Sequence, residues 1–356
     1  MYPYLQVDRN ALRRNASAIK EYVQVPVIGV VKSDGYGVSL LEAANAWRKA
    51  GVRVLAVSQS EDVIALRKGG FSGDILLLSP VADRDTLALM LRLNAILPVT
   101  SGEIAAFYAQ NSKMPVRVHV AVDTGMGRFG IHWADDDQLN RVYETQNLQF
   151  LGIYSHFSAS FEKGFRKTQR QLTKFLDTCK RLQSRGYCIG IRHIANSCAA
   201  LRFPETRLDA VRIGSALVGQ VSAPVALPLE RVAVCVAQVV DRKYLQPGDT
   251  TGYASVCCVK SHTNAIIVSV GHESGAGLLK TPDHYPLRPL LGYLARVLRL
   301  RFRPPCVEFQ GHSLKLIGRL GNQFSLFDAG DLDVPPGSLV RMKANLMYPW
   351  KRREFI

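Results

Sequence analysis

The sequence is poor in acidic residues and has no long apolar run. Its 356 residues include no stretch of the roughly eighteen uncharged apolar residues that a membrane-spanning helix requires. Residues 1–10 also lack the apolar centre of a signal peptide. These absences predict a cytoplasmic protein without a membrane partner.

The usual signatures of metal sites and disulfide frameworks are also missing. The eight histidines form no His-Glu-x-x-His pair, and there is no Gly-x-x-x-x-Gly-Lys phosphate loop. The cysteines form no Cys-x-x-Cys pair and are odd in number: Cys179, Cys188, Cys198, Cys235, Cys257, Cys258 and Cys306. We therefore expect reduced, mostly structural cysteines and no metal.

The excess of basic residues gives a net charge of +16. Clustered Lys and Arg would indicate a nucleic-acid partner, but here they are scattered. The densest groups, Arg299 to Arg303 and Lys351 to Arg353, accompany no recognisable nucleic-acid module. The charge is better explained by solubility or by attraction of anionic ligands.

Short apolar, β-branched segments alternate with helical patterns up to about residue 215. The helical patterns include 10–22, 41–49, 61–68 and 168–185. The candidate strands number eight: Val27–Val31, Val54–Val57, Ile75–Leu78, Ala95–Val99, Val116–Val122, Leu151–Tyr154, Ile189–Ile194 and Ala210–Ile213. Eight such units predict an α/β fold, a (β/α)₈ TIM barrel.

After Pro228 the pattern changes to alternating strands with Gly and Pro turns. The segment Ser222 to Pro228 contains two prolines that interrupt both periodicities. We therefore predict a barrel over residues 1–225 and a C-terminal mainly-β domain over 226–356. Its strands are expected at Val232–Val240, Ala265–Val270, Val307–Gln310, Lys315–Ile317 and Ser338–Met342.

Lys32 ends the apolar run 27–31 inside a Gly-rich turn. A lysine there can simply leave a strand for solvent, but an amine desolvated at a strand end can lose its proton and form a Schiff base. Other polar residues also follow predicted strands: Tyr36, Arg128, His156, Asn196, Ser197, Arg212, Gly214 and Ser215. Barrel enzymes build active sites at these strand ends, and the last two loops often hold a phosphate. A Schiff-base lysine beside a phosphate site indicates pyridoxal 5′-phosphate (PLP).

The chain resembles the alanine racemase family, the PLP enzymes of fold type III, over nearly its whole length. The resemblance is carried in order by Val31 to Gly37, Val122 to Gly130, Tyr154 to Phe157, Ile194 to Ser197, Asp209 to Gly214, Gly252-Tyr253 and Gly318 to Leu320. Jointly these motifs are specific, whereas none is so alone.

The resemblance implies a role for each matching residue. Lys32 would carry PLP and move the Cα proton on one face of the amino-acid substrate. The phosphate would be held by Tyr36, Ser197, the Gly214-Ser215 backbone and Tyr348, with Asn196 beside it. Arg212 would face the pyridine nitrogen, and His156 would be a catalytic residue that faces the substrate. Arg128 would bind the substrate carboxylate, assisted by the backbone near Asn322 from the second subunit of a head-to-tail homodimer.

The chain departs from the family at three places. His272, in Gly271 to Gly275, occupies the position of a tyrosine that serves as the second base. An imidazole with a pKa near 6.5 can fill that role. Asn322 and Gln323 replace a Met-Asp pair, and Ala121 replaces a lysine that is carbamylated in some members. The two amides suit a substrate more polar than alanine, or merely surface solvation.

Three functions remain open from the sequence. The first is an amino-acid racemase that uses Lys32 and His272 as its two bases. The second is another PLP reaction on this fold, a decarboxylation or the epimerisation of a larger substrate. The third is PLP binding without turnover. Arg212 argues against the decarboxylase, because related decarboxylases resemble one another in placing a carboxylate there. Arg128 and His156 argue against simple cofactor storage.

Overall fold

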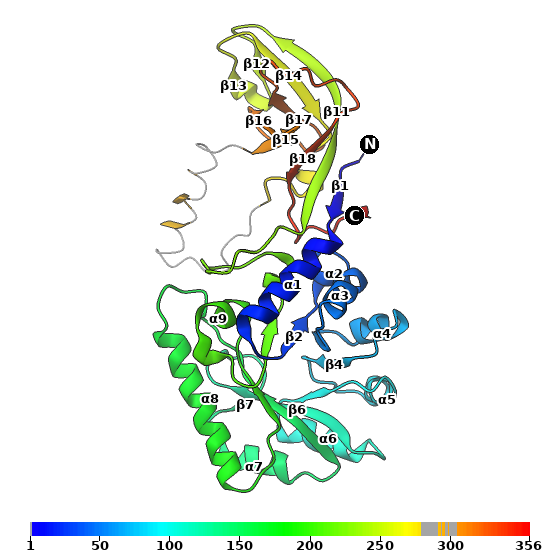
Figure 1. Ribbon diagram of the computed structural model, residues 1–356, viewed down its shortest axis with the longest axis vertical. Coiled ribbons are helices and arrows are strands. Elements are labelled where there is room, and N and C mark those ends of the chain that lie inside the picture. The colour runs from blue at the N-terminus through cyan, green and yellow to red at the C-terminus, as the bar shows by residue number, and fades with distance from the viewer. Residues whose placement is uncertain (1, 279–290, 293, 296–297, 299–304) are drawn as a thin grey trace. The chain divides into compact units, whose positions relative to one another are not determined.

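The computed structural model describes residues 2–278, 291–292, 294–295, 298 and 305–356, which divide into two compact units (Figure 1). The first comprises Arg9–Val232. The second comprises the described parts of Met1–Asp8 and Ala233–Ile356. The basic group from Arg299 to Arg303 lies outside the described residues. Among the described residues, no helix is long and apolar enough to cross a membrane.

The Arg9–Val232 unit is built on eight parallel strands: β2 (Val27–Val30), β3 (Val54–Val57), β4 (Asp74–Leu77), β5 (Leu97–Val99), β6 (Val116–Asp123), β8 (Leu148–Tyr154), β9 (Ile191–His193) and β10 (Val211–Ile213). They pair in the orders β10-β2-β3-β4 and β5-β6-β8-β9. Backbone bonds close the ring: Leu77 donates to Ile96 over 2.9 Å, and Arg212 donates to Ala195 over 2.9 Å. The TIM barrel predicted from the sequence is confirmed.

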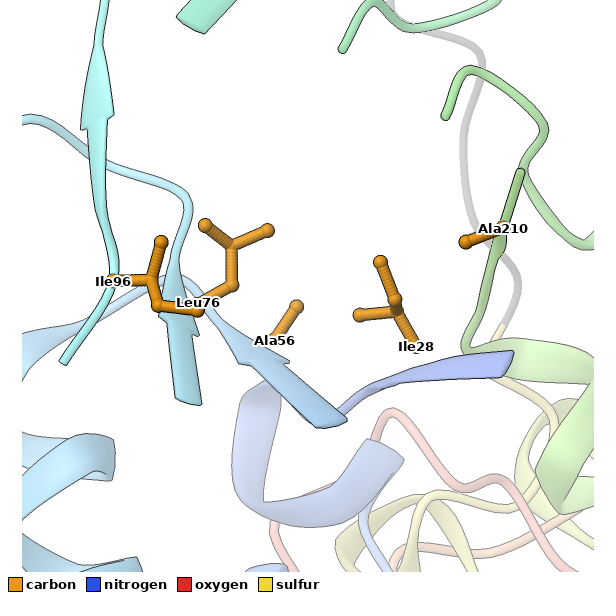
Figure 2. Close-up of a cluster of buried hydrophobic side chains, with 5 residues drawn as sticks. All are labelled: Ile28, Ala56, Leu76, Ile96 and Ala210. Carbon is orange, nitrogen blue, oxygen red and sulfur yellow. The ribbon is translucent and has the colours of Figure 1, made fainter. Parts of the chain in front are cut away.

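The barrel interior is filled by side chains from successive strands. Figure 2 shows five buried residues that come from neighbouring strands or from the residues beside them: Ile28, Ala56, Leu76, Ile96 and Ala210. Burying one large aliphatic side chain of this kind contributes roughly 1.5–3 kcal/mol. A packed interior leaves the ends of the strands as the place for chemistry.

Helices alternate with these strands: α1 (Arg9–Val23), α2 (Ser33–Tyr36), α3 (Leu40–Lys49), α4 (Ser60–Lys68), α5 (Arg84–Arg92), α6 (Gly102–Gln110), α7 (Asp136–Glu144), α8 (Arg166–Ser184) and α9 (Ser197–Arg202). Helix α8 shows why they form, since its buried residues Leu172, Phe175, Cys179 and Leu182 recur at helical spacing along one face. Asp83 caps α5 by accepting from the Thr86 N–H. The short strand β7 (Ile131–His132) pairs with β6 and was not predicted.

The second unit is mainly β, as predicted. Six strands pair in a ring: β11 (Ala233–Leu245), β14 (Thr263–Val268), β17 (Ser325–Asp328), β16 (His312–Ile317), β15 (Cys306–Phe309) and β18 (Leu339–Lys343). Strands β1 (Tyr4–Val7) and β19 (Arg353–Phe355) extend the sheet beyond β11, and β12 (Thr250–Thr251) pairs with β13 (Cys257–Cys258). Strand β11 has a bulge between Val239 and Asp241 in its pairing with β14, and an extra residue of this kind bends the strand.

The two units of the structure have different boundaries from the predicted domains. The prediction assigned residues 1–225 to the barrel, but β1 pairs with β11 and β19, which places the N-terminal strand in the β unit. At the other boundary the barrel unit extends to Val232. Asn15 on α1 explains part of this extension, because it exchanges two 2.9 Å hydrogen bonds with the backbone of Glu230.

Candidate active site

Lys32 follows β2 at the entrance to a turn of unusual backbone geometry. Ser33, Asp34, Gly35 and Tyr36 have φ values of 50°, 51°, 69° and 56°. Such left-handed residues are costly in a row, so the turn needs support. The Asp34 carboxylate supplies part of it by accepting a 2.8 Å hydrogen bond from the Leu40 N–H. The turn places Lys32 Nζ 5.9 Å from the centroid of the Tyr36 ring.

The environment of Lys32 favours the neutral amine. Its side chain reaches solvent, yet the pKa of Lys32 is lowered by desolvation and, secondarily, by the charge of Arg128. A neutral amine is the form that attacks a carbonyl carbon or accepts a proton. The pKa shift is in the direction that the chemistry predicted for this residue requires.

Arg212 on β10 is buried beneath the same end of the barrel. Its Nη1 donates to His193 Nδ1 over 2.6 Å and to the His193 carbonyl oxygen over 2.9 Å. Its Nη2 donates to the Ser155 carbonyl oxygen and to His156 Nδ1, the latter over 3.3 Å. The guanidinium also lies over the Tyr154 ring, 5.1 Å from its centroid. Burial lowers the pKa of Arg212 to about 10, which leaves it cationic at neutral pH.

The histidines around Arg212 are neutral. Burial, reinforced by the Arg212 charge, lowers the pKa of His119 and of His156 to about 3 and that of His193 well below its usual value. Because Arg212 can only donate, His193 Nδ1 must accept, and the His193 proton sits on Nε2. That Nε2 lies 2.8 Å from His119 Nδ1, which therefore accepts in turn. One arginine thus sets the tautomers of two buried imidazoles.

A second group of residues forms a small polar cradle. Ser197 Oγ accepts from the backbone N–H of Gly214 over 3.1 Å and of Ala216 over 3.4 Å. A Cβ atom built on Gly214 would lie 2.0 Å from Tyr36 Oη, so only glycine leaves room for that hydroxyl. The Ser197 and Tyr36 hydroxyls can donate to the oxygens of a phosphate, and a phosphate oxygen can replace Ser197 Oγ as the acceptor of the two N–H groups. Ser215, the first residue of the 3₁₀ helix Ser215–Val218, adjoins this cradle.

Unlike the other predicted cofactor contacts, Asn196 makes its hydrogen bonds at the start of helix α9. Its Oδ1 caps α9 by accepting from the Ala199 N–H over 3.1 Å, and it also accepts from Ser160 Oγ over 2.8 Å. These bonds hold the start of the helix that carries Ser197. In this structure Asn196 supports the cradle by fixing that helix.

Asp123 holds the start of the loop that leads from β6 to Arg128, and the Arg128 side chain is available to an anion. Asp123 Oδ1 accepts from the N–H groups of Gly125 and Met126, each over 2.8 Å. These bonds outweigh the opposing effect of burial and hold the pKa of Asp123 below its usual value. Arg128 itself is exposed, and within the described residues it has no ion pair. A guanidinium so presented can bind a carboxylate in bidentate fashion.

The remaining predicted residues lie together in the β unit. The His272 N–H donates to the Gly321 carbonyl oxygen over 3.0 Å, and the Glu273 N–H donates to that of Asn322 over 2.9 Å. His272 Nδ1 lies 3.1 Å from the Ala276 carbonyl oxygen, so Nδ1 carries the proton and Nε2 can act as a base. Tyr348 Oη donates to the Glu273 carbonyl oxygen.

Asn322, Gln323 and Tyr348 line one cavity of about 940 Å³ within the β unit. The predicted substrate amides and the predicted phosphate tyrosine therefore share one surface.

Sequence reasoning missed two members of the Arg212 network. His193 and His119 both lie inside predicted strands, and no pattern in the sequence marks them as partners of Arg212. A signal was present at Gly152, which pairs with His119 across β6 and β8. A Cβ built there would lie 2.8 Å from the His119 ring, so the glycine makes room for the imidazole.

Comparisons with known proteins identify relatives of this chain. Residues 7–222 match the family model "Alanine racemase, N-terminal domain". The alanine racemase of Clostridium tetani is 31% identical over 283 residues, which cover 76% of this chain and 73% of that protein. The amino-acid racemase of Enterococcus faecalis is 27% identical over 338 residues, 92% of this chain and 45% of that protein. This chain thus spans less than half the length of that relative.

The fold agrees as well. A solved structure of alanine racemase from Clostridium difficile superposes with a TM-score of 0.83 at 21% identity, covering 100% of this chain and 96% of that one. At that identity the likeness concerns the fold alone. Together with the family-model match, which covers more than half of the chain, these results show that the chain belongs to the alanine racemase family of isomerases.

Proposed function

We propose that this protein is a PLP-dependent amino-acid racemase. The observation that carries the proposal is the convergence, at one end of the barrel, of Lys32 with its lowered pKa, buried cationic Arg212 and the Ser197–Gly214 cradle. The cradle fits a phosphate monoester, and the residue type at Gly214 is dictated by the Tyr36 hydroxyl. When bound, PLP withdraws electrons from the substrate Cα and so makes its proton acidic.

Each barrel residue then has a defined task. Lys32 holds the cofactor through its amine and moves the Cα proton on one face of the substrate. Arg212 keeps its own proton, so it would leave a pyridine nitrogen held against it unprotonated and would thereby suppress side reactions that need a strong electron sink. Arg128 binds the substrate carboxylate. Neutral His156 offers a polar contact without adding a third positive charge.

The second base in this proposal is His272. Its Nε2 is left free to accept a proton because Nδ1 faces the Ala276 carbonyl oxygen. We infer a head-to-tail homodimer in which the β unit of one subunit brings His272, Asn322 and Gln323 to the barrel of the other. A cytoplasmic location is part of the same proposal.

A panel of L- and D-amino acids, incubated with protein and PLP and resolved by chiral chromatography, tests the reaction and the substrate together. Racemisation of at least one amino acid by wild type, and of none by Lys32→Ala, is the expected result. Carbon dioxide release without racemisation would favour the decarboxylase. Cofactor binding with neither product would favour a PLP-binding protein without turnover or a larger substrate.

A further inference from the structure

Gln171 on α8 is a buried amide whose hydrogen-bonding capacity is fully used. Its Nε2 donates to Thr124 Oγ1 over 3.3 Å and to the His156 carbonyl oxygen over 3.1 Å. Its Oε1 accepts from the Ser158 N–H over 3.0 Å and from Ser158 Oγ over 3.1 Å. A flipped amide would set its oxygen against the His156 carbonyl oxygen, so these partners fix its orientation.

These four bonds join two loops that carry predicted substrate residues. Thr124 begins the loop after β6 that leads to Arg128, and Ser158 follows His156 in the loop after β8. The loops also touch directly, because Thr124 Oγ1 lies 2.8 Å from Ser155 Oγ. Gly125, with φ of 129°, packs beside the amide: a Cβ built there would meet Gln171 atoms at 3.8–4.0 Å. One side chain from α8 therefore spans both loops.

We propose that Gln171 is a positioning residue that sets the place of the Arg128 loop relative to His156, and thereby the affinity for the substrate carboxylate. The inference rests on the proposed racemase function for its substrate. Gln171 makes no hydrogen bond to Lys32, Tyr36, Ser197 or Gly214 in the described structure. Its loss is therefore expected to affect amino-acid binding more than cofactor binding.

The substitution Gln171→Glu removes the two N–H donors of the amide and so tests their contribution alone. It keeps the size and the acceptor oxygen but replaces the donating nitrogen by a second oxygen, which would face the His156 carbonyl oxygen. Gln169→Glu is the matched control, because Gln169 lies on the same helix, is exposed and undergoes the same chemical change.

Hydrogen exchange on the cofactor-free protein tests the coupling of the loops without any reaction. In Gln171→Glu, the backbone amides of Gly125, Met126 and Ser158 should exchange at least about tenfold faster than in wild type, because breaking the bridge frees both loops. Gln169→Glu should match wild type. Unchanged exchange in the loop that contains Gly125 would overturn the proposal.

A second experiment uses the PLP-loaded protein with acetate as a carboxylate probe and with the racemised amino acid. Gln171→Glu should raise the acetate Kd and the amino-acid KM about ten- to a hundredfold, with PLP affinity within about threefold of wild type. Thr124→Val should act similarly, and Thr124→Ser, which keeps the hydroxyl, should restore wild-type values. If the effects of Gln171→Glu and Thr124→Val simply multiply in the double variant, the two residues do not act as a unit and the proposal fails.

The outcomes separate this inference from the proposed function. If wild type binds no PLP and racemises nothing, the racemase proposal fails, and the exchange experiment still decides whether Gln171 couples the loops. If Gln171→Glu does not fold, Thr124→Val removes the same bridge from its other end, and its exchange and acetate binding decide the case.

Discussion

Arg212 Nη1 lies 2.6 Å from His193 Nδ1, and this contact fixes where the protons sit on a chain of buried groups. Arginine only donates, so His193 turns its own proton toward His119, and neither ring gains a positive charge. The network therefore holds a single cation at its centre. Arg212 keeps that charge although burial lowers its pKa to about 10.

This neutrality predicts a pH dependence of stability. The pKa of His119 is lowered to about 3 in the folded protein from an ordinary 6.5, so between these values the unfolded chain binds more protons. The stabilising effect of neutral His119 is complete above pH 6.5 and is lost as the pH falls toward 3, by about 1.4 kcal/mol per pH unit. The free energy of unfolding is measured with urea at several pH values and plotted against pH. Between pH 6.5 and 3 the slope of this plot should be smaller for His119→Gln, by the equivalent of about one proton, than for wild type or for the exposed control His312→Gln. An equal slope for His119→Gln and wild type would mean that another group takes up the proton.

Lys32→Ala should abolish the covalent link to PLP, because only an amine forms that bond. Wild-type protein incubated with PLP and reduced with borohydride should yield one pyridoxyl-modified peptide, the one that contains residue 32. Peptide mass mapping reads the result. A modified peptide from any other lysine, at similar yield, would contradict the assignment.

Gly214→Ala should weaken PLP binding by at least about tenfold. The new methyl group would lie 2.0 Å from Tyr36 Oη, so either the hydroxyl or the N–H of residue 214 must leave the cradle. Gly102→Ala is the control, since a Cβ there meets nothing within 4 Å. Equilibrium dialysis with PLP measures both affinities. Equal affinities would mean that the phosphate binds elsewhere.

His272→Ala should stop net racemisation but leave the exchange catalysed on the Lys32 face partly intact. Each base addresses one face of the same planar carbanion, so removing one leaves the other able to exchange the proton with solvent. Proton NMR in deuterated water follows Cα exchange for each enantiomer, while chiral chromatography follows racemisation. Undiminished racemisation would remove His272 from the mechanism.

Mixed dimers test whether the site is shared between subunits. Lys32→Ala and His272→Ala protomers should each be inactive, whereas a heterodimer should contain one site with both bases and recover up to half of the wild-type activity per dimer. Differently tagged protomers, refolded together and purified through both tags, provide the sample. Activity no higher than that of either parent, in heterodimers of confirmed composition, would mean that both bases belong to one chain.

The sequence predicted the barrel well because its strands are apolar runs bounded by helices with clear periodicity. Predicted and observed barrel strands differ by at most three residues at either end, the largest difference being Leu151 against Leu148 at the start of β8. The strands β1, β7, β12, β13, β17 and β19 were missed. Each is short and lies outside the alternation with helices that marked the equally short barrel strands.

The sequence singled out the residues of the proposed site but not the hydrogen bonds among them. Lys32 and Ser197 follow strands and Arg212 lies on one, and a parallel barrel brings the ends of its strands together. Which groups bond to Arg212 depends instead on side chains inside the strands, such as His193, whose direction the pattern does not reveal. Gln171 was not predicted for a similar reason. In the sequence of a polar helix, a buried glutamine cannot be distinguished from a solvated one, because its four hydrogen-bond partners come from other parts of the chain.

The pairing of β1 with β11 and β19 has a consequence for how the chain is made. Leu5 pairs with Cys235 on one side and with Arg353 on the other, so the first strand must wait until more than two hundred further residues have left the ribosome. The intervening Arg9–Val232 unit contains all its own strand partners and can be complete before then. The β unit is therefore interrupted in sequence by the barrel, and β19 can pair with β1 only after residues 353–355 have emerged. Truncation after residue 350 should for this reason leave β1 with one exposed edge, and with it a site for pairing between chains.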